Sequence, residues 1–388
     1  MIIKKVKAKV ISNSRGEDTI KIQVKSDLGK GEASAPSGAS KGKHEAKDFA
    51  FNVDECVDKT NKMEWKEMEI NSFDDLSLIE DKIKDLGANP VIAMEYAVLK
   101  SFGKQLWKTL DPKVRELPRP LGNVIGGGVH IRGGNHCEFQ EFLLYPYNSK
   151  TIDDAVKSNE LAHNFVKKHI KNMKLDSAMT DEGAWALELS IEEILDLLKK
   201  VSNEVFDETG INLKIGIDIA ANSFWDGENY VYRDKKLSSL NQVEYISTLI
   251  ENYDLHYVED PFMEEDFIGF AELTAKYGEK CMITGDDLTV TNLERLERAI
   301  TEKSINSMIV KPNQNGSLLG FRDVIDLAKK NKINLVISHR SGETMDDSLA
   351  DLGVGFKIPI IKCGIHGSER KVKLDRLRKI SKEIKFDL

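Results

Sequence analysis

Hydrophobic and polar residues alternate near the start of the chain. Ile20, Ile22 and Val24 are separated by polar side chains, and turn-forming pairs that contain glycine flank this run at 15–16 and 28–29. A period of two is typical of a strand that buries one face. The first 35 residues are therefore predicted to form a β-meander.

A loop, a helical stretch and a linker are expected next. Residues 36–42 are small or turn-forming and predict an irregular loop, after which the pattern is helical. Prolines then cluster between 112 and 120, where they interrupt regular structure. We place the domain boundary near Arg119, which predicts a smaller α+β domain at 1–119 and a second domain at 120–388.

The second domain repeats short β-branched runs that are separated by helical patterns. This alternation predicts parallel strands joined by crossover helices. A barrel is favoured over an open dinucleotide-binding sheet, because no GxGxxG motif follows a first strand. The predicted fold is therefore a TIM-like α/β barrel. Its expected strands are 214–218, 256–259, 282–285, 307–311, 334–338 and 360–362.

Two of the intervening helices are expected to begin with a capping box. Ser190 is followed three residues later by Glu193, and Thr291 by Glu294. In a capping box each side chain accepts a hydrogen bond from the other residue's backbone N–H. Both helices are therefore predicted to start directly after the Ser or Thr.

The first three expected strands end in acidic residues. Asp218, Glu259 and Asp286 each follow an apolar run. The C-terminal ends of barrel strands meet at one rim, where active sites lie. A single acid there would more simply cap the next helix, but three on adjacent strands suit a hard divalent cation with oxygen ligands.

The next three strands end in basic residues. Lys311, Arg340 and Lys362 follow apolar runs in turn. A lysine in this position either extends its ammonium group to the rim or has a function. A dication beside Lys311 would lower the pKa of its ammonium group, so that it could act as a base near pH 7.

These strand ends resemble the motifs of the enolase family. The most specific strings are GDDLTVTN at 285–292 and SHRSGET at 338–344, and the similarity extends from about residue 10 to residue 378. The resemblance implies a Mg²⁺-dependent hydro-lyase that converts 2-phosphoglycerate reversibly to phosphoenolpyruvate in glycolysis and gluconeogenesis. Further matching segments are 36–40, 44–46, 140–142, 181–183 and 368–370.

The resemblance also implies two Mg²⁺ ions in each active site. Asp218, Glu259 and Asp286 would hold the first ion. Ser40, in the small-residue loop, would help to hold the second through the substrate. Carboxylate and hydroxyl oxygens are suitable ligands for Mg²⁺.

Four residues match the family's catalytic positions. Lys311 would remove the carbon-bound proton. Glu182 would protonate the departing hydroxyl, with Glu141 beside it, and His130 would lie on a loop that closes over the site. Fixed groups of opposite charge would then stabilise the charge that develops on the substrate in the transition state, which is a large contribution to catalysis.

A third set of residues would bind the substrate, which is expected to be a small phosphorylated hydroxy acid. Lys362 would pair with the substrate carboxylate, and Gln140 would lie nearby. Arg340 and Ser341 would bind the phosphate, with His339 next to them. The planar guanidinium group suits a phosphate because it can donate two parallel hydrogen bonds.

The sequence departs from the family pattern mainly in the loops. Lys41 and Ala184 replace the usual Thr and Gly, and Pro312 replaces an aliphatic residue. The segment between His130 and Glu141 is two residues longer than usual. It adds Arg132 and His136. Together with Lys41, these charges either tighten phosphate binding or point to solvent without effect, and the sequence leaves both interpretations open.

The composition excludes several other functions. A formal net charge of −8 and the lack of a basic tail argue against a nucleic acid partner. No apolar run approaches the roughly 20 residues of a membrane span. The four cysteines lie far apart without a CxxC pair, which favours a reducing cytoplasm over zinc or disulfides. The resemblance implies a homodimer or a larger homo-oligomer.

Two alternatives to this function stay open from the sequence. A paralogue with the same chemistry could act on a different, larger acid, which the added loop charges would suit. A non-catalytic protein could also keep the fold. The retained Lys311, Glu182 and Glu141 argue against the non-catalytic protein. Unpaired buried charges destabilise a fold, and a protein without catalytic function would have no reason to keep them.

Overall fold

The N-terminal domain begins with the predicted meander. The computed structural model describes residues 1–39, 42–131 and 137–384. β1 (Ile3–Ser12), β2 (Asp18–Ser26) and β3 (Lys30–Ser34) form an antiparallel sheet in that order. Ile20, Ile22 and Val24 are all buried, so the alternating pattern has identified the buried face.

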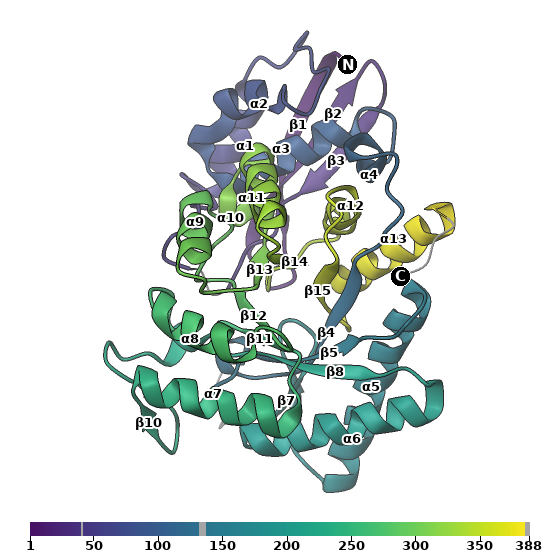
Figure 1. Ribbon diagram of the computed structural model, residues 1–388. Coiled ribbons are helices and arrows are strands. Elements are labelled where there is room, and N and C mark those ends of the chain that lie inside the picture. The colour runs from purple at the N-terminus through teal and green to yellow at the C-terminus, as the bar shows by residue number, and fades with distance from the viewer. Residues whose placement is uncertain (40–41, 132–136, 385–388) are drawn as a thin grey trace.

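Helices cover one face of this sheet. α1 (Val53–Lys62), α2 (Leu76–Ile83) and α3 (Ala88–Lys100) follow the loop, and α4 (Leu106–Leu110) leads out of the domain. α3 packs against β2 and β3 and is buried from Ala88 to Leu99. Figure 1 shows this domain above the larger one, which confirms the α+β part of the fold prediction.

The second domain is a closed eight-stranded barrel, because β15 pairs with β4. All six strands expected from the sequence are present, with bounds that differ by a few residues at most. β4 and β5 were not expected. The barrel strands are β4 (Arg119–Gly126), β5 (Glu141–Pro146), β8 (Leu213–Asp218), β11 (Tyr257–Glu259), β12 (Met282–Gly285), β13 (Ser307–Val310), β14 (Asn334–Ser338) and β15 (Ile360–Gly364). The proposed boundary at 119/120 stays a prediction.

The six expected strands pair in parallel, as predicted, whereas β5, which was not expected, runs antiparallel to both β4 and β8. The physical reason is the connection. Parallel neighbours need a crossover, usually a helix, and the chain between β4 and β5 has only the 3₁₀ turn Gly128–His130 in its described part. Glu141 therefore lies opposite Asp218, at the start of its strand and yet at the same rim.

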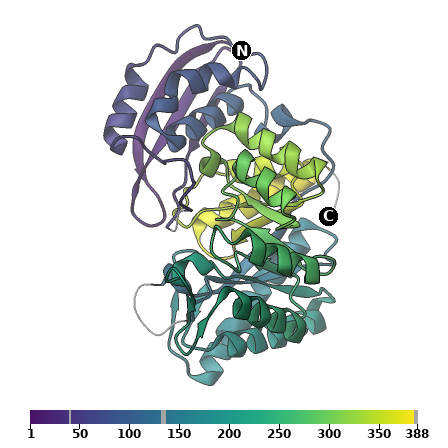
Figure 2. The same ribbon diagram turned by 60° about the vertical axis from the view of Figure 1, so that its left-hand side comes forward.

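Helices surround the barrel (Figures 1 and 2). α5 (Ile152–Met173) and α6 (Ile191–Thr209) are separated by the short hairpin β6 (Ser177–Met179) and β7 (Trp185–Leu187), and β7 extends the sheet beside β4. No helix in the described ranges is long and apolar enough to cross a membrane. The other elements are β9 (Tyr230–Val231), β10 (Lys236–Leu237), α7 (Ser239–Tyr253), α8 (Phe267–Tyr277), α9 (Leu293–Thr301), α10 (Pro312–Asn315), α11 (Leu318–Lys330), α12 (Ser348–Gly355) and α13 (Ser368–Ile384).

One of the two expected capping boxes forms. Ser190 and Glu193 cap α6 reciprocally, as predicted. The capping box at Thr291 was a wrong prediction, because α9 begins one residue later, with Asn292 as its N-cap. Thr291 is turned inward instead: its backbone φ is +50°, and its hydroxyl donates to Gln314 at 2.8 Å.

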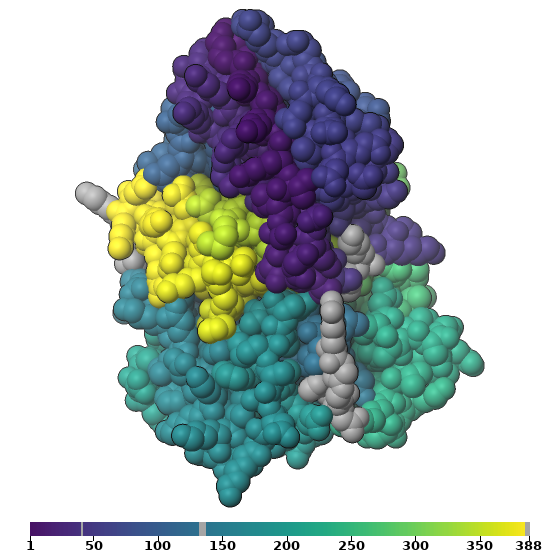
Figure 3. Space-filling view, turned by 180° about the vertical axis from the view of Figure 1, so that it is seen from behind, coloured from purple at the N-terminus to yellow at the C-terminus, as the bar shows by residue number. Residues whose placement is uncertain are grey.

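The N-terminal domain contacts the catalytic rim of the barrel. Ser37 and Gly342 exchange two backbone hydrogen bonds of 2.9 and 2.8 Å. Ser14, in the turn between β1 and β2, accepts a bond from the Glu343 N–H at 3.0 Å. In Figure 3 the early residues reach down onto the barrel beside the C-terminal segment. The N-terminal domain therefore forms part of the surroundings of the barrel rim.

Candidate active site

One pocket at the rim collects most of the predicted site residues. Glu259 is the exception among those described, because it is fully buried behind the pocket wall. Ser40 lies outside the described residues, as do Lys41, Arg132 and His136. The pocket lining comprises Gly38, Glu45, His130, Gln140, Glu141, Glu182, Asp218, Asp286, Asp287, Lys311, Ser338, His339, Arg340, Ser341 and Lys362.

Lys362 joins three carboxylates at the ends of neighbouring strands. Its Nζ lies 2.8 Å from Asp218 Oδ2, 2.8 Å from Glu259 Oε2 and 3.3 Å from Glu141 Oε1. All four side chains are buried, so each charge depends on the others. Burial lowers the pKa of Lys362, but the surrounding carboxylates, Asp218 first, raise it well above its ordinary value.

Asp286 has a different set of neighbours. It forms an ion pair with Lys311 and accepts a hydrogen bond from Gln314 Nε2 at 2.9 Å. Its carboxylate groups with those of Asp260 and Asp287, with ligand atoms within 4.8 Å of one another. Two lysines thus pair with the three predicted metal ligands: Lys362 with Asp218 and Glu259, and Lys311 with Asp286.

Asp260 organises the backbone at this point. It has a φ of +41°, and its two carboxylate oxygens accept hydrogen bonds from the N–H groups of Asp286 (2.9 Å) and Asp287 (2.7 Å). A positive φ is uncommon for a non-glycine residue, although Asp tolerates it better than most. Asp260 therefore sets the direction in which the β12 acids leave their strand.

The acids fit a hard divalent cation. Their donor atoms are all carboxylate oxygens, and Glu259 Oε1 is buried without a hydrogen-bond partner among the described residues. Burial and the charge of Asp218 raise the pKa of Glu259 to about 8. Burial and the charge of Asp286 raise the pKa of Asp287 to about 7. Additional positive charge near these acids would stabilise their ionised forms.

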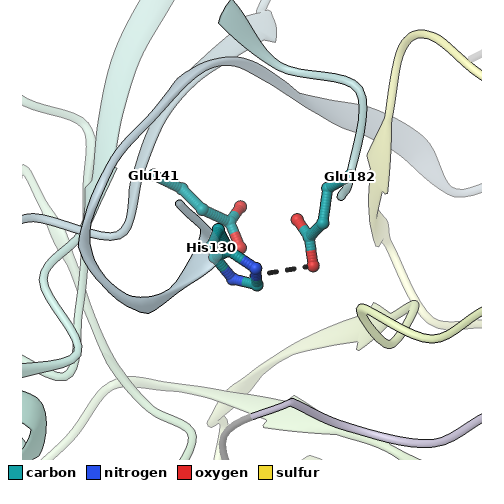
Figure 4. Close-up of side chains that lie close together, drawn as sticks. All are labelled: His130, Glu141 and Glu182. Atoms are coloured by element: carbon teal, nitrogen blue, oxygen red, sulfur yellow. Dashed lines mark ion pairs between the residues drawn. The ribbon is translucent and has the colours of Figure 1, made fainter. Parts of the chain in front are cut away.

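His130 and two glutamates converge on the other side of the pocket (Figure 4). Ligand atoms of His130, Glu141 and Glu182 lie within 4.8 Å of one another. His130 Nδ1 is 2.8 Å from Asp181 Oδ1, and its Nε2 is 3.8 Å from Glu182 Oε1. Asp181 also forms an ion pair with Arg15 from the N-terminal domain.

The surroundings shift the pKa values of the two glutamates in opposite directions. Burial raises the pKa of Glu141 well above its usual range, in spite of Lys362. Burial acts in the same direction on Glu182, but His339 and His130 outweigh it and hold its pKa well below the usual range. Two neighbouring carboxyl groups whose pKa values are pushed apart are typical of general acid–base sites.

The phosphate-binding candidates lie beside the first loop. Arg340 is 4% exposed, and its Nη2 is 2.9 Å from Glu45 Oε2. The hydroxyl of Ser341 accepts a hydrogen bond from Ala39 N at 2.6 Å. His339 Nε2 is 3.4 Å from Glu182 Oε2, so this residue lies between the phosphate candidates and the acid.

Two departures from the family pattern have a structural explanation. Ala184 is fully buried, and its N–H donates to Thr180 Oγ1 at 3.1 Å, so the extra methyl group is accommodated. Pro312 is the first residue of α10, where a missing N–H costs no helical hydrogen bond.

Sequence reasoning assigned no role to four residues that contact the predicted site. Asp181 and Glu45 lie in matched motifs, and their positions beside Glu182 and His44 were the available signal. Gln314 was part of the motif around Lys311. Arg15 was noted only as part of a turn, and no local pattern connects it with a site in the other domain.

The fold and the pocket together define a two-domain barrel enzyme that is equipped for acid–base chemistry on an anionic substrate. Two family models match the chain: "Enolase, N-terminal domain" over residues 3–110, and "Enolase, C-terminal TIM barrel domain" over residues 114–387. The chain belongs to the enolase family.

Relatives of similar length support the same assignment. The enolase of Archaeoglobus fulgidus is 40% identical over 394 residues, which cover 98% of this chain and 97% of the relative. The enolase of Methanosphaera stadtmanae is 39% identical over 404 residues, with 99% and 97% covered. The protein is therefore an enzyme of the hydro-lyase class, and these comparisons do not favour the alternative functions.

Proposed function

We propose that the protein converts 2-phosphoglycerate reversibly to phosphoenolpyruvate and water. One observation carries the proposal: a buried lysine, two buried glutamates and a buried arginine face one pocket, and the surroundings shift the pKa values of the two glutamates in opposite directions. Removal of a proton next to a carboxylate requires a base on one side, an acid for the leaving hydroxyl and cations for the two anionic groups.

Asp218, Glu259 and Asp286 are the proposed ligands of one Mg²⁺, and Ser40 is a proposed ligand of a second. When bound, Mg²⁺ would supply positive charge beside the substrate carboxylate, where negative charge develops. Lys362 lies among the same carboxylates and would bind the substrate carboxylate. Its short contacts with Asp218 and Glu259 support this position at the centre of the negative charge.

Lys311 is the proposed base, and it must be neutral when it accepts the proton. Burial lowers the pKa of its ammonium group, but Asp286 reverses this and raises the pKa above its ordinary value. Lys311 can therefore act as the base only if Asp286 pairs with another cation, in place of Lys311, during the reaction. Asp286 has the lone pairs to do so, because Lys311 and Gln314 occupy only part of its carboxylate.

Glu182 is the proposed acid, with Glu141 beside it. The lowered pKa of Glu182 favours its ionised form, so it must receive a proton before it can protonate the leaving hydroxyl. His130 and Glu141 are the nearest sources. Burial lowers the pKa of His130, but Glu182 and Asp181 raise it above its ordinary value, which favours the charged imidazole.

Arg340 and Ser341 are the proposed phosphate ligands, with His339 and Gln140 as neighbours. Arg340 stays charged under all physiological conditions and can donate two hydrogen bonds in parallel. We also propose that the enzyme acts in the cytoplasm as a homo-oligomer. The four cysteines are all free and buried, which agrees with a reducing compartment.

An absorbance assay tests the function directly. Purified protein with Mg²⁺ and 2-phosphoglycerate should produce the ultraviolet absorbance of an enol phosphate, and excess chelator should abolish it. The variant Asp286→Ala should be inactive at every Mg²⁺ concentration. Full activity in excess chelator would contradict the metal requirement, and no product with Mg²⁺ present would contradict the reaction.

A further inference from the structure

Glu45 lies between the phosphate side and the metal side of the pocket. Its side chain is 4% exposed. Oε2 accepts a hydrogen bond from Arg340 Nη2 at 2.9 Å. Oε1 accepts from the Gly42 N–H at 3.1 Å and from Gln314 Nε2 at 3.3 Å. Both oxygens of Glu45 are therefore held by the protein itself.

Gln314 continues the same network toward the proposed base. Its Nε2 also donates to Asp286 Oδ1 at 2.9 Å, and its Oε1 accepts from Thr291 Oγ1 at 2.8 Å. That hydroxyl in turn accepts a bond from the backbone N–H of Lys311 at 2.9 Å. One buried amide thus contacts both the carboxylate that holds Arg340 and the carboxylate that pairs with Lys311.

The guanidinium group of Arg340 is fixed from several directions. Nη1 donates to Asn313 Oδ1 at 3.3 Å. A Cβ on Gly38 would lie 2.0 Å from Nη2, so only glycine lets the loop backbone approach so closely. A buried guanidinium that lost its carboxylate partner would be strongly destabilised, and its planar fork would no longer have a defined direction.

We propose that Glu45 and Gln314 are positioning residues. Glu45 orients the guanidinium group of Arg340 so that its donors face the substrate phosphate. Gln314 connects that orientation with Asp286 and Lys311, so the phosphate subsite and the proton-abstracting side are built as one unit. This inference rests on the proposed function, because it takes Arg340 as the phosphate ligand.

In the opposite role, Glu45 would be a competing anion on Arg340 that the substrate phosphate must displace. The two roles predict opposite effects of neutralising Glu45 on phosphate affinity. A positioning residue strengthens phosphate binding, so its neutralisation should weaken the affinity. A competitor weakens phosphate binding, so its neutralisation should strengthen the affinity. The positioning role is favoured because the second oxygen of Glu45 is bound at the same time by Gly42 and Gln314.

The experiment measures phosphate affinity and steady-state kinetics on the same variants of the full chain. Inorganic phosphate is titrated calorimetrically, and KM and kcat are measured with 2-phosphoglycerate and Mg²⁺. Glu45→Gln should weaken phosphate binding and raise KM about tenfold, with kcat changed less than about threefold. Gln314→Met should raise KM and also lower kcat, because Gln314 contacts Asp286 as well as Glu45.

Two further variants keep the test decisive. Glu265→Gln removes an exposed carboxylate that pairs with His44, the residue next to Glu45 in the chain. This variant should leave both measurements unchanged. Glu45→Asp keeps the charge and should recover part of the phosphate affinity if Glu45→Gln folds poorly.

The outcomes separate this inference from the proposed function. Unchanged or tighter phosphate binding in Glu45→Gln would overturn the positioning role. If the native protein binds phosphate, and Glu45→Gln weakens that binding, while 2-phosphoglycerate is not dehydrated, the positioning role stands and the proposed reaction fails.

Discussion

The two sides of the pocket are built in different ways. On one side, Lys311 directly follows β13 and Lys362 lies within β15, and the hydrogen bonds of the closed barrel hold these strands in register. On the other side, His130 and Glu182 come from loops, and Asp181 connects them with Arg15 of the N-terminal domain. The lysines of the first side are placed by the register of the barrel strands, whereas the second side is placed by loops and by an ion pair with the N-terminal domain.

The outer ion pair of the loop side is more exposed than the ion pairs around Lys362. The side chain of Lys362 and those of its acidic partners are at most 4% exposed. The side chains of Arg15 and Asp181 are 17% and 19% exposed. Solvent weakens an ion pair, so the loop side should tolerate the loss of an outer contact better than the strand side tolerates the loss of a lysine.

The largest expected effect is on the strand side. Lys311→Ala should lower kcat about 10⁴-fold, the upper range for loss of a general base, and should stop exchange of the carbon-bound proton with solvent. Lys311→Arg is the matched control, because it keeps the charge beside Asp286 but cannot lose a proton. Proton exchange is followed by magnetic resonance in D₂O. Exchange that persisted in Lys311→Arg would assign the base to another residue.

A smaller effect is expected for the acid on the loop side. Glu182→Gln should lower the rate of dehydration about 10²- to 10³-fold, because the departing hydroxyl loses its proton donor. Proton exchange should continue, since Lys311 is untouched. The ratio of exchange to product formation is therefore the informative measurement. Equal loss of both rates would mean that the two sides of the pocket do not act in separate steps.

The connection between the domains should have a moderate effect. Arg15→Met removes the ion pair between Arg15 and Asp181 and should lower kcat about tenfold, or ~1.4 kcal/mol. The matched control is Arg322→Met, which removes a pair with Asp74 away from the pocket. Steady-state kinetics of both variants decide the point. A rate for Arg15→Met that equals the control would show that the loop side does not need the N-terminal domain.

The smallest effect concerns the stability of that domain interface. Glu95 on α3 is fully buried and accepts a hydrogen bond from the Leu318 N–H of the barrel at 3.0 Å. Burial, followed by the charge of Glu80, raises its pKa well above the ordinary value of 4.5. The folded state thus binds this proton more tightly than the unfolded state, so stability falls as pH rises from 4.5 through the raised pKa.

Glu95→Gln should remove this dependence. At pH 8 the variant should be more stable by about 1 kcal/mol, which corresponds to roughly 2 °C in Tm, and the difference should vanish near pH 4. Thermal unfolding across the pH range is the measurement. A native protein whose Tm does not fall relative to the variant as pH rises would show that Glu95 keeps its charge without cost.

The strand side could be predicted from the sequence because each of its positions follows from the residues next to it in the chain. An apolar run identifies a barrel strand, and the residue that follows it lies at the rim. Asp218 and Lys362 were placed in this way, and both lie in the pocket. The same rule gives only the neighbourhood: it did not predict that Asp286 would group with Asp260 and Asp287.

The loop side could not be predicted by that rule. His130 and Glu182 follow no strand of the expected kind, and only the family resemblance drew attention to them. Arg15 and Asp181 are 166 positions apart in the chain, and no pattern within a short window of residues encodes such a contact. Thr291 was misread for a related reason, since its hydroxyl bonds Gln314 and the Lys311 N–H, which are distant in sequence, rather than the N–H of Glu294.

Antiparallel β5 also affects how this enzyme can diversify. In most barrels a rim loop leads from a strand into a helix, which absorbs insertions before the chain returns. Here the connection from β4 leads straight back to Glu141, the first residue of β5. A change in its length is therefore transmitted directly to the acid–base pair and not to β11–β15. This connection offers evolution a route to new substrates that leaves the strand-end lysines unaltered.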